Sequence, residues 1–307
     1  MEIFLQQIIN GLVQGSVYAL VALGYTMVYG ILGLINFAHG EVVMVGAMLA
    51  LSALTAILGW GVPPVLALLL SVGLAMAGCM ALGYSIERIA YRPLRHAPRL
   101  APLITAIGVS IVLQNLAMMI WGRQYHSFPT LFATSSHVIG GAIINDIQIA
   151  IVILAVLIMA GLMIVVHRTR LGRAMRAVAE NQHSAQLTGV DVNRVISITF
   201  MLGSALAAIA GLMVSANYGL AHYYMGFLLG LKAFTAAVLG GIGNLRGAML
   251  GGLLLGLIES LGTGYIGDLT GGVLGSNYQD VFAFFVLIAV LVFRPSGLLG
   301  ERIAERA

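Results

Sequence analysis

The sequence contains very little charge. Only 8% of its 307 residues are charged, and its basic residues include a single lysine, Lys232. A soluble domain carries about 25% charged residues, whereas 60% of this chain is hydrophobic and its mean hydropathy is +1.01. This composition excludes a water-soluble fold and indicates that lipid surrounds much of the chain.

Several chemical motifs are missing as well. Cys79 is the single cysteine, which excludes an internal disulfide. No GxxxxGK[ST] phosphate loop occurs, so the chain cannot bind ATP as a P-loop ATPase does. HExxH, GxSxG and paired intramembrane aspartates are also missing, which argues against an intramembrane enzyme. We therefore expect a chain that is not an enzyme, with no cofactor and no metal site.

Long apolar runs are present instead. About 20 apolar residues span the hydrocarbon core as a helix, whereas a barrel shows short alternating strands. The predicted fold class is all-α, a polytopic transmembrane helix bundle of about nine spans (eight to ten). The runs lie near 5–30, 41–58, 64–87, 101–121, 147–166, 195–216, 227–240, 248–263 and 279–293. The first lacks a basic n-region, so we expect a span rather than a secretory signal.

The arginines predict the orientation. Cytoplasmic loops are enriched in Lys and Arg, and nine spans place thirteen of the fourteen arginines on one side, with only Arg123 on the other. This predicts an outside N-terminus, a cytoplasmic C-terminus, and an outside loop 122–146 that forms a small ordered cap. The net charge of +4 then reflects topology and gives no evidence for nucleic-acid binding. We expect one transmembrane domain over residues 1–307.

Glycine is abundant, and two glycine-rich stretches interrupt the apolar runs. Many of the 39 glycines recur every four residues, which allows close helix packing. The stretches "GILGLINFAHGE" (30–41) and "LGGIGNLRGA" (239–248) insert polar groups, a pattern that points to a transport path; tight cytoplasmic turns are the alternative. The candidate path residues are Asn36, His39, Gly40, Gly240, Gly241 and Asn244. Both asparagines are expected to bond backbone groups freed by helix breaks.

Four charged residues lie in or beside the predicted spans. Glu41 and Glu87 are at span ends, where we expect snorkelling or helix capping. Lys232 and Glu259 lie deeper on neighbouring spans, where an ionisable residue is a functional candidate and usually has a partner. These two side chains can form a pair with each other.

One polar segment separates two strongly apolar runs. "RTRLGRAMRAVAENQHSAQLTGV" extends from Arg168 to Val190, and a helical wheel divides it into an apolar face (Leu171, Met175, Val178, Ala185) and a polar face (Arg173, Arg176, Glu180, Ser184). Arg176 and Glu180 are four residues apart and can pair weakly. Gly189 is suited to end a helix and Asp191 to cap the next. The pattern predicts one or two short amphipathic helices in a cytoplasmic loop 168–194, which either lie on anionic lipid or dock a soluble protein.

Three long stretches resemble a known family. "RAVAENQHSAQLTGV" before an Arg and an apolar span looks like the cytoplasmic loop of ABC importer permeases. "INFAHGEVVMVGA" and "LKAFTAAVLGGIGNLRGAMLGG" resemble the branched-chain amino acid permease family, specifically its LivH-type subunit, and the resemblance covers nearly the whole chain. The loop has "AVAEN" where the EAA motif of the other large importer class has Glu-Ala-Ala. The resemblance implies a fold similar to the vitamin B12 permease.

The resemblance also implies partners and a role for the polar segment. An importer of leucine, isoleucine and valine in the bacterial cytoplasmic (inner) membrane would pair this chain with a homologous, LivM-like permease, two ATPase subunits that bind ATP, and a periplasmic or extracellular binding protein. The predicted ATPase-coupling residues are Arg173, Arg176, Ala177, Ala179, Glu180, Asn181, Ala185 and Gly189. An ion-coupled carrier or channel, or a family member for urea or short amides, is the alternative.

Overall fold

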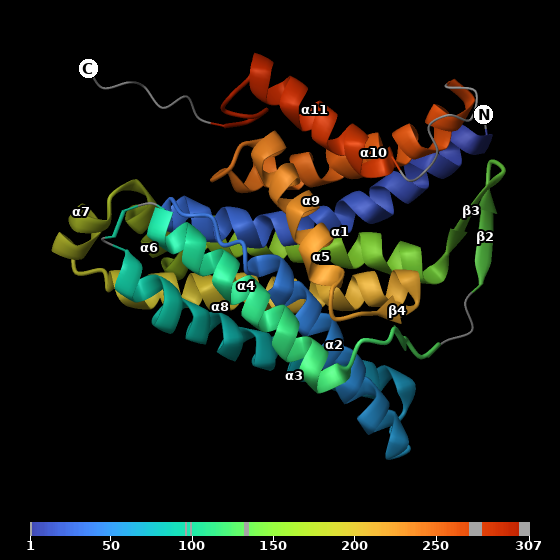
Figure 1. Cartoon of the computed structure of the whole chain (residues 1–307), viewed down its shortest axis with the longest axis horizontal. Coiled ribbons are helices and arrows are strands. Elements are labelled where there is room, and N and C mark those ends of the chain that lie inside the picture. The colour runs from blue at the N-terminus through green and yellow to red at the C-terminus, as the bar shows by residue number, and fades with distance from the viewer. Residues whose placement is uncertain (1, 96, 99, 132–134, 270–277, 301–307) are drawn as a thin grey trace. The chain divides into compact units, whose positions relative to one another are not determined.

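The structure, a computed structural model, describes residues 2–95, 97–98, 100–131, 135–269 and 278–300. Its α-helices are α1 Glu2–Leu32, α2 His39–Gly59, α3 Pro64–Ile86, α4 Leu100–Trp121, α5 Asp146–Arg168, α6 Arg170–Glu180, α7 Gln182–Leu187, α8 Val192–Tyr218, α9 Met225–Gly240, α10 Leu245–Leu269 and α11 Gln279–Phe293 (Figure 1). A π-helical turn, η1 Glu87–Tyr91, and a 3₁₀ turn, η2 Arg92–Leu94, extend α3. The fold is therefore mostly helical, as predicted.

Helix length separates the predicted spans into two groups. Each of the nine predicted apolar runs coincides with a helix to within a few residues. Among the described residues, seven helices are long and apolar enough to cross a membrane, whereas α9 and α11 are shorter apolar helices. The long first run is one unbroken helix of 31 residues.

The all-α prediction missed two small antiparallel sheets. In one, β2 Ser136–Ile139 pairs with β3 Ala142–Asn145; in the other, β1 His126–Ser127 pairs with β4 Leu220–Ala221. The turn between β2 and β3 is Gly140–Gly141, with φ of 59° and 88°. A two-residue hairpin turn of this kind needs positive φ at both positions, which glycine adopts without steric cost. The "GG" in the sequence was therefore a hairpin signal.

The chain groups into two compact units, each built from separate segments. Unit 1 consists of residues 1–26, 134–159 and 232–307, and unit 2 of residues 27–133 and 160–231. In unit 1, α1 and α10 pack closely at glycines: a Cβ added at Gly11 or Gly15 would lie 2.8 Å from Leu257 Cα or Leu253 Cα, respectively. Small residues thus bring two helix backbones together, as their spacing predicted.

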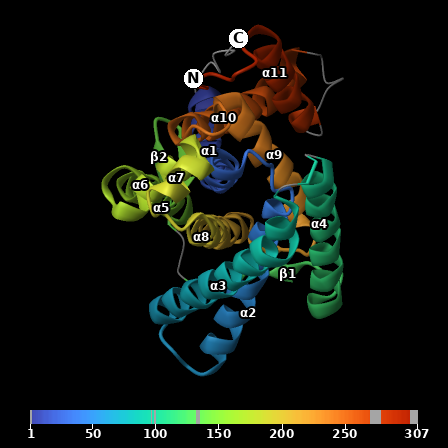
Figure 2. The ribbon, with the colours of Figure 1, turned by 90° about the vertical axis from the view of Figure 1, so that its left-hand side faces the viewer.

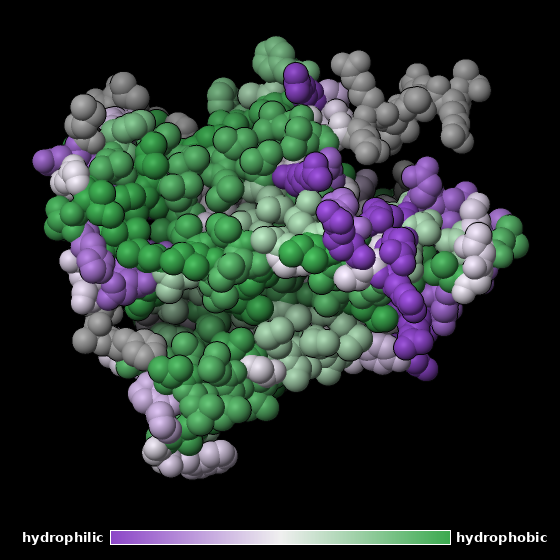
Figure 3. All heavy atoms as spheres, turned by 180° about the vertical axis from the view of Figure 1, so that it is seen from behind, coloured by the Kyte–Doolittle hydropathy of each residue, from purple (hydrophilic) through white to green (hydrophobic). Residues whose placement is uncertain are grey.

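Unit 2 is centred on α2, α3 and α8, which pack against one another (Figure 2). Gly46 of α2 faces Ala208 of α8, and a Cβ at Gly46 would lie 2.5 Å from the Ala208 Cα. Large apolar side chains such as Leu69 on α3 and Ile104 on α4 are exposed. Figure 3 shows hydrophobic residues over most of the face that it draws, with hydrophilic residues gathered where α6 and α7 lie. This distribution suits a chain whose helices face lipid.

Candidate functional site

The polar segment predicted from the sequence forms two short helices with a cap at each start. Thr169 precedes α6 and its hydroxyl accepts from the Gly172 amide at 3.1 Å. Asn181 caps α7 by accepting from Ser184 N at 2.9 Å. Gly189 follows α7 with φ of 86°, and Asp191 caps α8 by accepting from Arg194 N at 3.0 Å. The predictions of short helices, a glycine stop and an aspartate cap are confirmed.

The two faces of this segment also follow the predicted pattern. Met175, Val178 and Ala185 are buried. The exposed residues include most of the predicted coupling set: Arg173, Arg176, Ala177, Ala179, Glu180, Asn181 and Gly189. Arg176 donates to the backbone carbonyl of Val166, not to Glu180, so the weak pair predicted between them is replaced by a contact with the end of α5. The exposed face carries small, polar and charged residues together with the apolar Leu187.

Two further contacts attach the segment to the rest of unit 2. Gly172 lies against the last carbonyls of α5, where a Cβ would collide with Val165 O and Val166 O. Gln182 donates from Nε2 to the Ile31 carbonyl in the last turn of α1, at 3.0 Å. The segment is thus held at both of its helices, and Gln182 connects it to the chain just before the break that the structure shows at 33–38, inside the predicted stretch 30–41.

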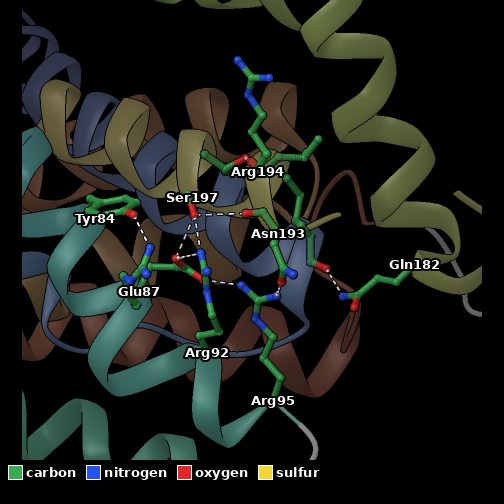
Figure 4. A network of polar contacts seen from close by, with 12 residues as sticks. Tyr84, Glu87, Arg92, Arg95, Gln182, Asn193, Arg194 and Ser197 are labelled. Carbon is green, nitrogen blue, oxygen red and sulfur yellow. Dashed lines mark hydrogen bonds and ion pairs between the residues drawn. The ribbon is translucent and has the colours of Figure 1, made fainter. Parts of the chain in front are cut away.

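A buried acidic node lies beside the start of α8 (Figure 4). The Glu87 carboxylate accepts from Arg92 Nη2 at 2.8 Å, from Ser197 Oγ at 2.8 Å, and from Arg95. Arg95 also donates to Asn193 Oδ1 at 2.6 Å. Glu87 is fully buried, so the prediction that it snorkels to water was wrong. The arginines that follow in η2 and beyond fold back and compensate its charge, which keeps the carboxylate inside the protein.

The first glycine-rich stretch does break the helical chain. The residues between α1 and α2 include Gly33, with φ of 64°, and Asn36, whose Oδ1 accepts from the Ala38 amide at 3.1 Å. Tyr91 Oη donates to the same Asn36 oxygen at 3.1 Å. The prediction that the Asn36 side chain bonds a backbone group freed by the helix break is confirmed. His39, buried, begins α2.

The second stretch separates α9 from α10 in the same way. Gly241 has φ of 108°, and Asn244 accepts from Gly247 N at 3.2 Å while donating to Leu299 O at 2.9 Å. Gly240 packs directly on α10, because a Cβ there would collide with Gly247 O. These predicted path residues belong to unit 1, whereas Asn36, His39 and Gly40 belong to unit 2 with the coupling segment. Their role beside a transport path stays a prediction.

Two further acidic residues are buried in the described part of the chain, and within that part only one of them has a cationic partner. In unit 1, Lys232 Nζ lies 2.6 Å from Glu259 Oε1 and 2.7 Å from Asp280 Oδ1. Tyr18 donates to Glu259 Oε2 at 2.7 Å. The Lys232–Glu259 pair is confirmed; Asp280 and Tyr18 were missed because nothing in the sequence brings α1 or α11 to that point. In unit 2, Glu41 is 1% exposed, so its predicted snorkelling was also wrong.

Comparison with known proteins identifies what this arrangement belongs to. A family described as "Branched-chain amino acid transport system / permease component" matches residues 7–291. The chain belongs to this permease family. It is 48% identical to the high-affinity branched-chain amino acid transport system permease protein BraD of Pseudomonas aeruginosa over 99% of this chain and 98% of that protein. It is 45% identical to the high-affinity branched-chain amino acid transport system permease protein LivH of Escherichia coli K12, over 99% of this chain and 97% of that protein.

More distant relatives extend the same family. A probable branched-chain amino acid transport permease protein of Methanocaldococcus jannaschii is 30% identical over 95% of this chain and 91% of its own. No solved structure matches the chain significantly. Within the described part of the chain, no group of three or more His, Cys, Asp or Glu side chains is arranged to hold a metal ion.

Proposed function

We propose that this chain is the permease subunit of an ATP-driven importer for leucine, isoleucine and valine. Membership in the permease family over residues 7–291 carries the proposal. The chain forms half of the translocation pore, a homologous permease forms the other half, and two ATPase subunits and a substrate-binding protein complete the system. About nine spans, with the N-terminus outside and the C-terminus in the cytoplasm, make one permease domain with a vitamin B12-type fold.

The α6–α7 segment is the attachment point for an ATPase subunit. Its exposed face carries alanines that allow close approach and the polar side chains of Arg173, Glu180 and Asn181. Met175 and Val178 pack its other face into the protein. A movement of the bound ATPase subunit therefore moves the segment as one body.

A movement of the α6–α7 segment can be transmitted to two other helices of unit 2. In the first direction, Asp191 caps α8, and Ser197 in the first turns of α8 donates a hydrogen bond to the Glu87 carboxylate on η1. Gln182 holds the last turn of α1, next to the break at 33–38. Both routes end at elements that precede or follow a transmembrane helix, which is what coupling between ATP hydrolysis and alternating access requires.

The test begins with the partners. The tagged chain is purified from native membranes, co-purifying subunits are identified, and the complex is reconstituted in proteoliposomes with its binding protein. We expect leucine uptake that needs both ATP and the binding protein. Uptake by this chain alone, driven by an ion gradient, would instead make it a secondary carrier. Competition by urea or short amides, without competition by isoleucine or valine, would assign a different substrate.

A further inference from the structure

Among the residues that the structure describes, three glutamates are fully or almost fully buried, and one of them differs from the others. Glu87 is paired with Arg92 and Arg95, and Glu259 is paired with Lys232. Glu41, at 1% exposure, forms no ion pair with any Lys, Arg or His among the described residues. A buried carboxylate without a compensating cation is costly, so its position calls for an explanation.

The surroundings of Glu41 supply hydrogen bonds without supplying charge. Oε1 accepts from Gln114 Nε2 at 2.6 Å and from Ser110 Oγ at 3.3 Å, and both donors are neutral groups on α4. Oε2 is buried and has no hydrogen-bond partner in the described part of the chain. One carboxylate oxygen is therefore oriented by α4, and the other is left to accept from something outside this set of side chains.

Glu41 Oε2 faces the point where α2 crosses α9, and the residues in contact there are glycines. A Cβ at Gly226 of α9 would lie 2.8 Å from Glu41 Oε2, and a Cβ at Gly40 would lie 2.5 Å from Gly226 O and 2.8 Å from Gly230 Cα. No side chain at these positions separates the carboxylate from the crossing. This crossing is also close to the non-helical residues 33–38, and Gln182 of the α6–α7 segment bonds Ile31 just before them.

We propose that Glu41 receives the ammonium group of the transported amino acid from the pore when α2 and α9 separate at this crossing. A primary ammonium brings one positive charge and three donors, which matches an oriented carboxylate that lacks both a cation and a donor at one oxygen. Gln114 and Ser110 act as positioning residues that hold Oε1. Separation of the glycine crossing in the transport cycle exposes Oε2. This inference rests on the proposed function.

The first test asks whether position 41 becomes accessible. Glu41→Cys in a Cys79→Ser background is placed in the complete reconstituted complex and treated with the small cationic thiol reagent methanethiosulfonate ethylammonium. We expect labelling during ATP turnover at least fivefold faster than without ATP. Leu54→Cys, equally buried on the same helix in an apolar cluster, is the control and should stay unlabelled. An unlabelled Glu41→Cys, or labelling at the same rate without ATP, would overturn the proposal.

The second test asks whether the charge is used. Glu41→Gln keeps an acceptor for Gln114 and removes the charge, so we expect leucine uptake to fall at least tenfold, with partial recovery in Glu41→Asp. Glu2→Gln, an exposed carboxyl at the start of α1, is the charge-matched control and should transport normally. Membrane level and co-purification of the ATPase show that each variant assembles. Normal uptake by assembled Glu41→Gln would mean that Glu41 is a neutral structural acid. Absence of leucine uptake by the wild-type complex would reject the proposed function instead.

Discussion

Gln182 Nε2 donates a hydrogen bond to the backbone carbonyl of Ile31 at 3.0 Å. These residues are 151 positions apart, and the bond joins the second helix of the coupling segment to the last turn of α1. A carbonyl in that turn has no partner further along its own helix, so the side chain satisfies a group that the break at Gly33 leaves open. This bond is the most direct contact between the coupling segment and a candidate path stretch.

Removing this bond should weaken coupling. The net contribution of a hydrogen bond between neutral groups is about 1 kcal/mol. We therefore expect Gln182→Ala to lower the number of leucine molecules transported per ATP hydrolysed roughly fivefold, while the complex still assembles. Gln186→Ala, exposed on the same short helix, is the matched control and should behave as wild type. Equal ratios in both variants would show that the bond to Ile31 transmits nothing.

The exposed face of α6 should dock the ATPase. Ala179→Trp adds bulk where close approach is needed, and Glu180→Arg reverses a charge, so both should reduce ATPase co-purification and substrate-stimulated hydrolysis severalfold. Neither residue is buried, so membrane insertion should not change. A lipid-surface role predicts the opposite for Glu180→Arg: tighter binding to anionic vesicles and normal coupling.

The buried ion pairs of Glu87 with Arg92 and Arg95 should stabilise unit 2. Breaking a buried ion pair by removing one partner costs about 3–5 kcal/mol, and because Arg92 is 31% exposed we expect the lower end of that range for Glu87→Gln. The measurement is the thermal unfolding midpoint of the purified complex in detergent. Glu2→Gln should leave the midpoint unchanged. An unchanged midpoint in Glu87→Gln as well would mean that water replaces the carboxylate without loss.

The glycine contact between α9 and α10 should not tolerate a side chain. Gly240→Leu would place Cβ against Gly247 O, so we expect both transport and the yield of folded protein to fall. The loss of folded protein follows from the backbone contact with α10, which leaves no room for a side chain. Gly108→Leu, with open space around its Cβ, should insert and transport normally. Wild-type uptake by Gly240→Leu would identify the stretch as an ordinary turn.

Topology can be tested directly by labelling. In a Cys79→Ser background, Ser136→Cys should react with an impermeant reagent added outside intact cells, and Ser184→Cys should react only after the membrane is opened. Both side chains are exposed, so access depends on the side of the membrane. Outside labelling at position 184 would contradict the proposed orientation and with it the coupling role of the segment.

Local sequence patterns determined much of this protein. The nine apolar runs, the amphipathic division of the 168–190 segment and the cap at Asp191 all depend on residues within a few positions of one another, so local sequence was enough to predict them. The glycine breaks were predictable for the same reason. The Gly140–Gly141 turn was equally local, and its signal was overlooked.

Only the tertiary structure decided which charges are buried and what they meet. Glu41 and Glu87 lie near the ends of apolar runs, and each is bonded in the interior by a side chain from a distant segment, Gln114 and Ser197 respectively. The contacts of Lys232 with Asp280 and of Gln182 with Ile31 likewise cross 48 and 151 positions of chain. Periodicity places a side chain on a face of its own helix, but the neighbour on that face is set by how helices pack, and that information is absent from any local stretch of sequence.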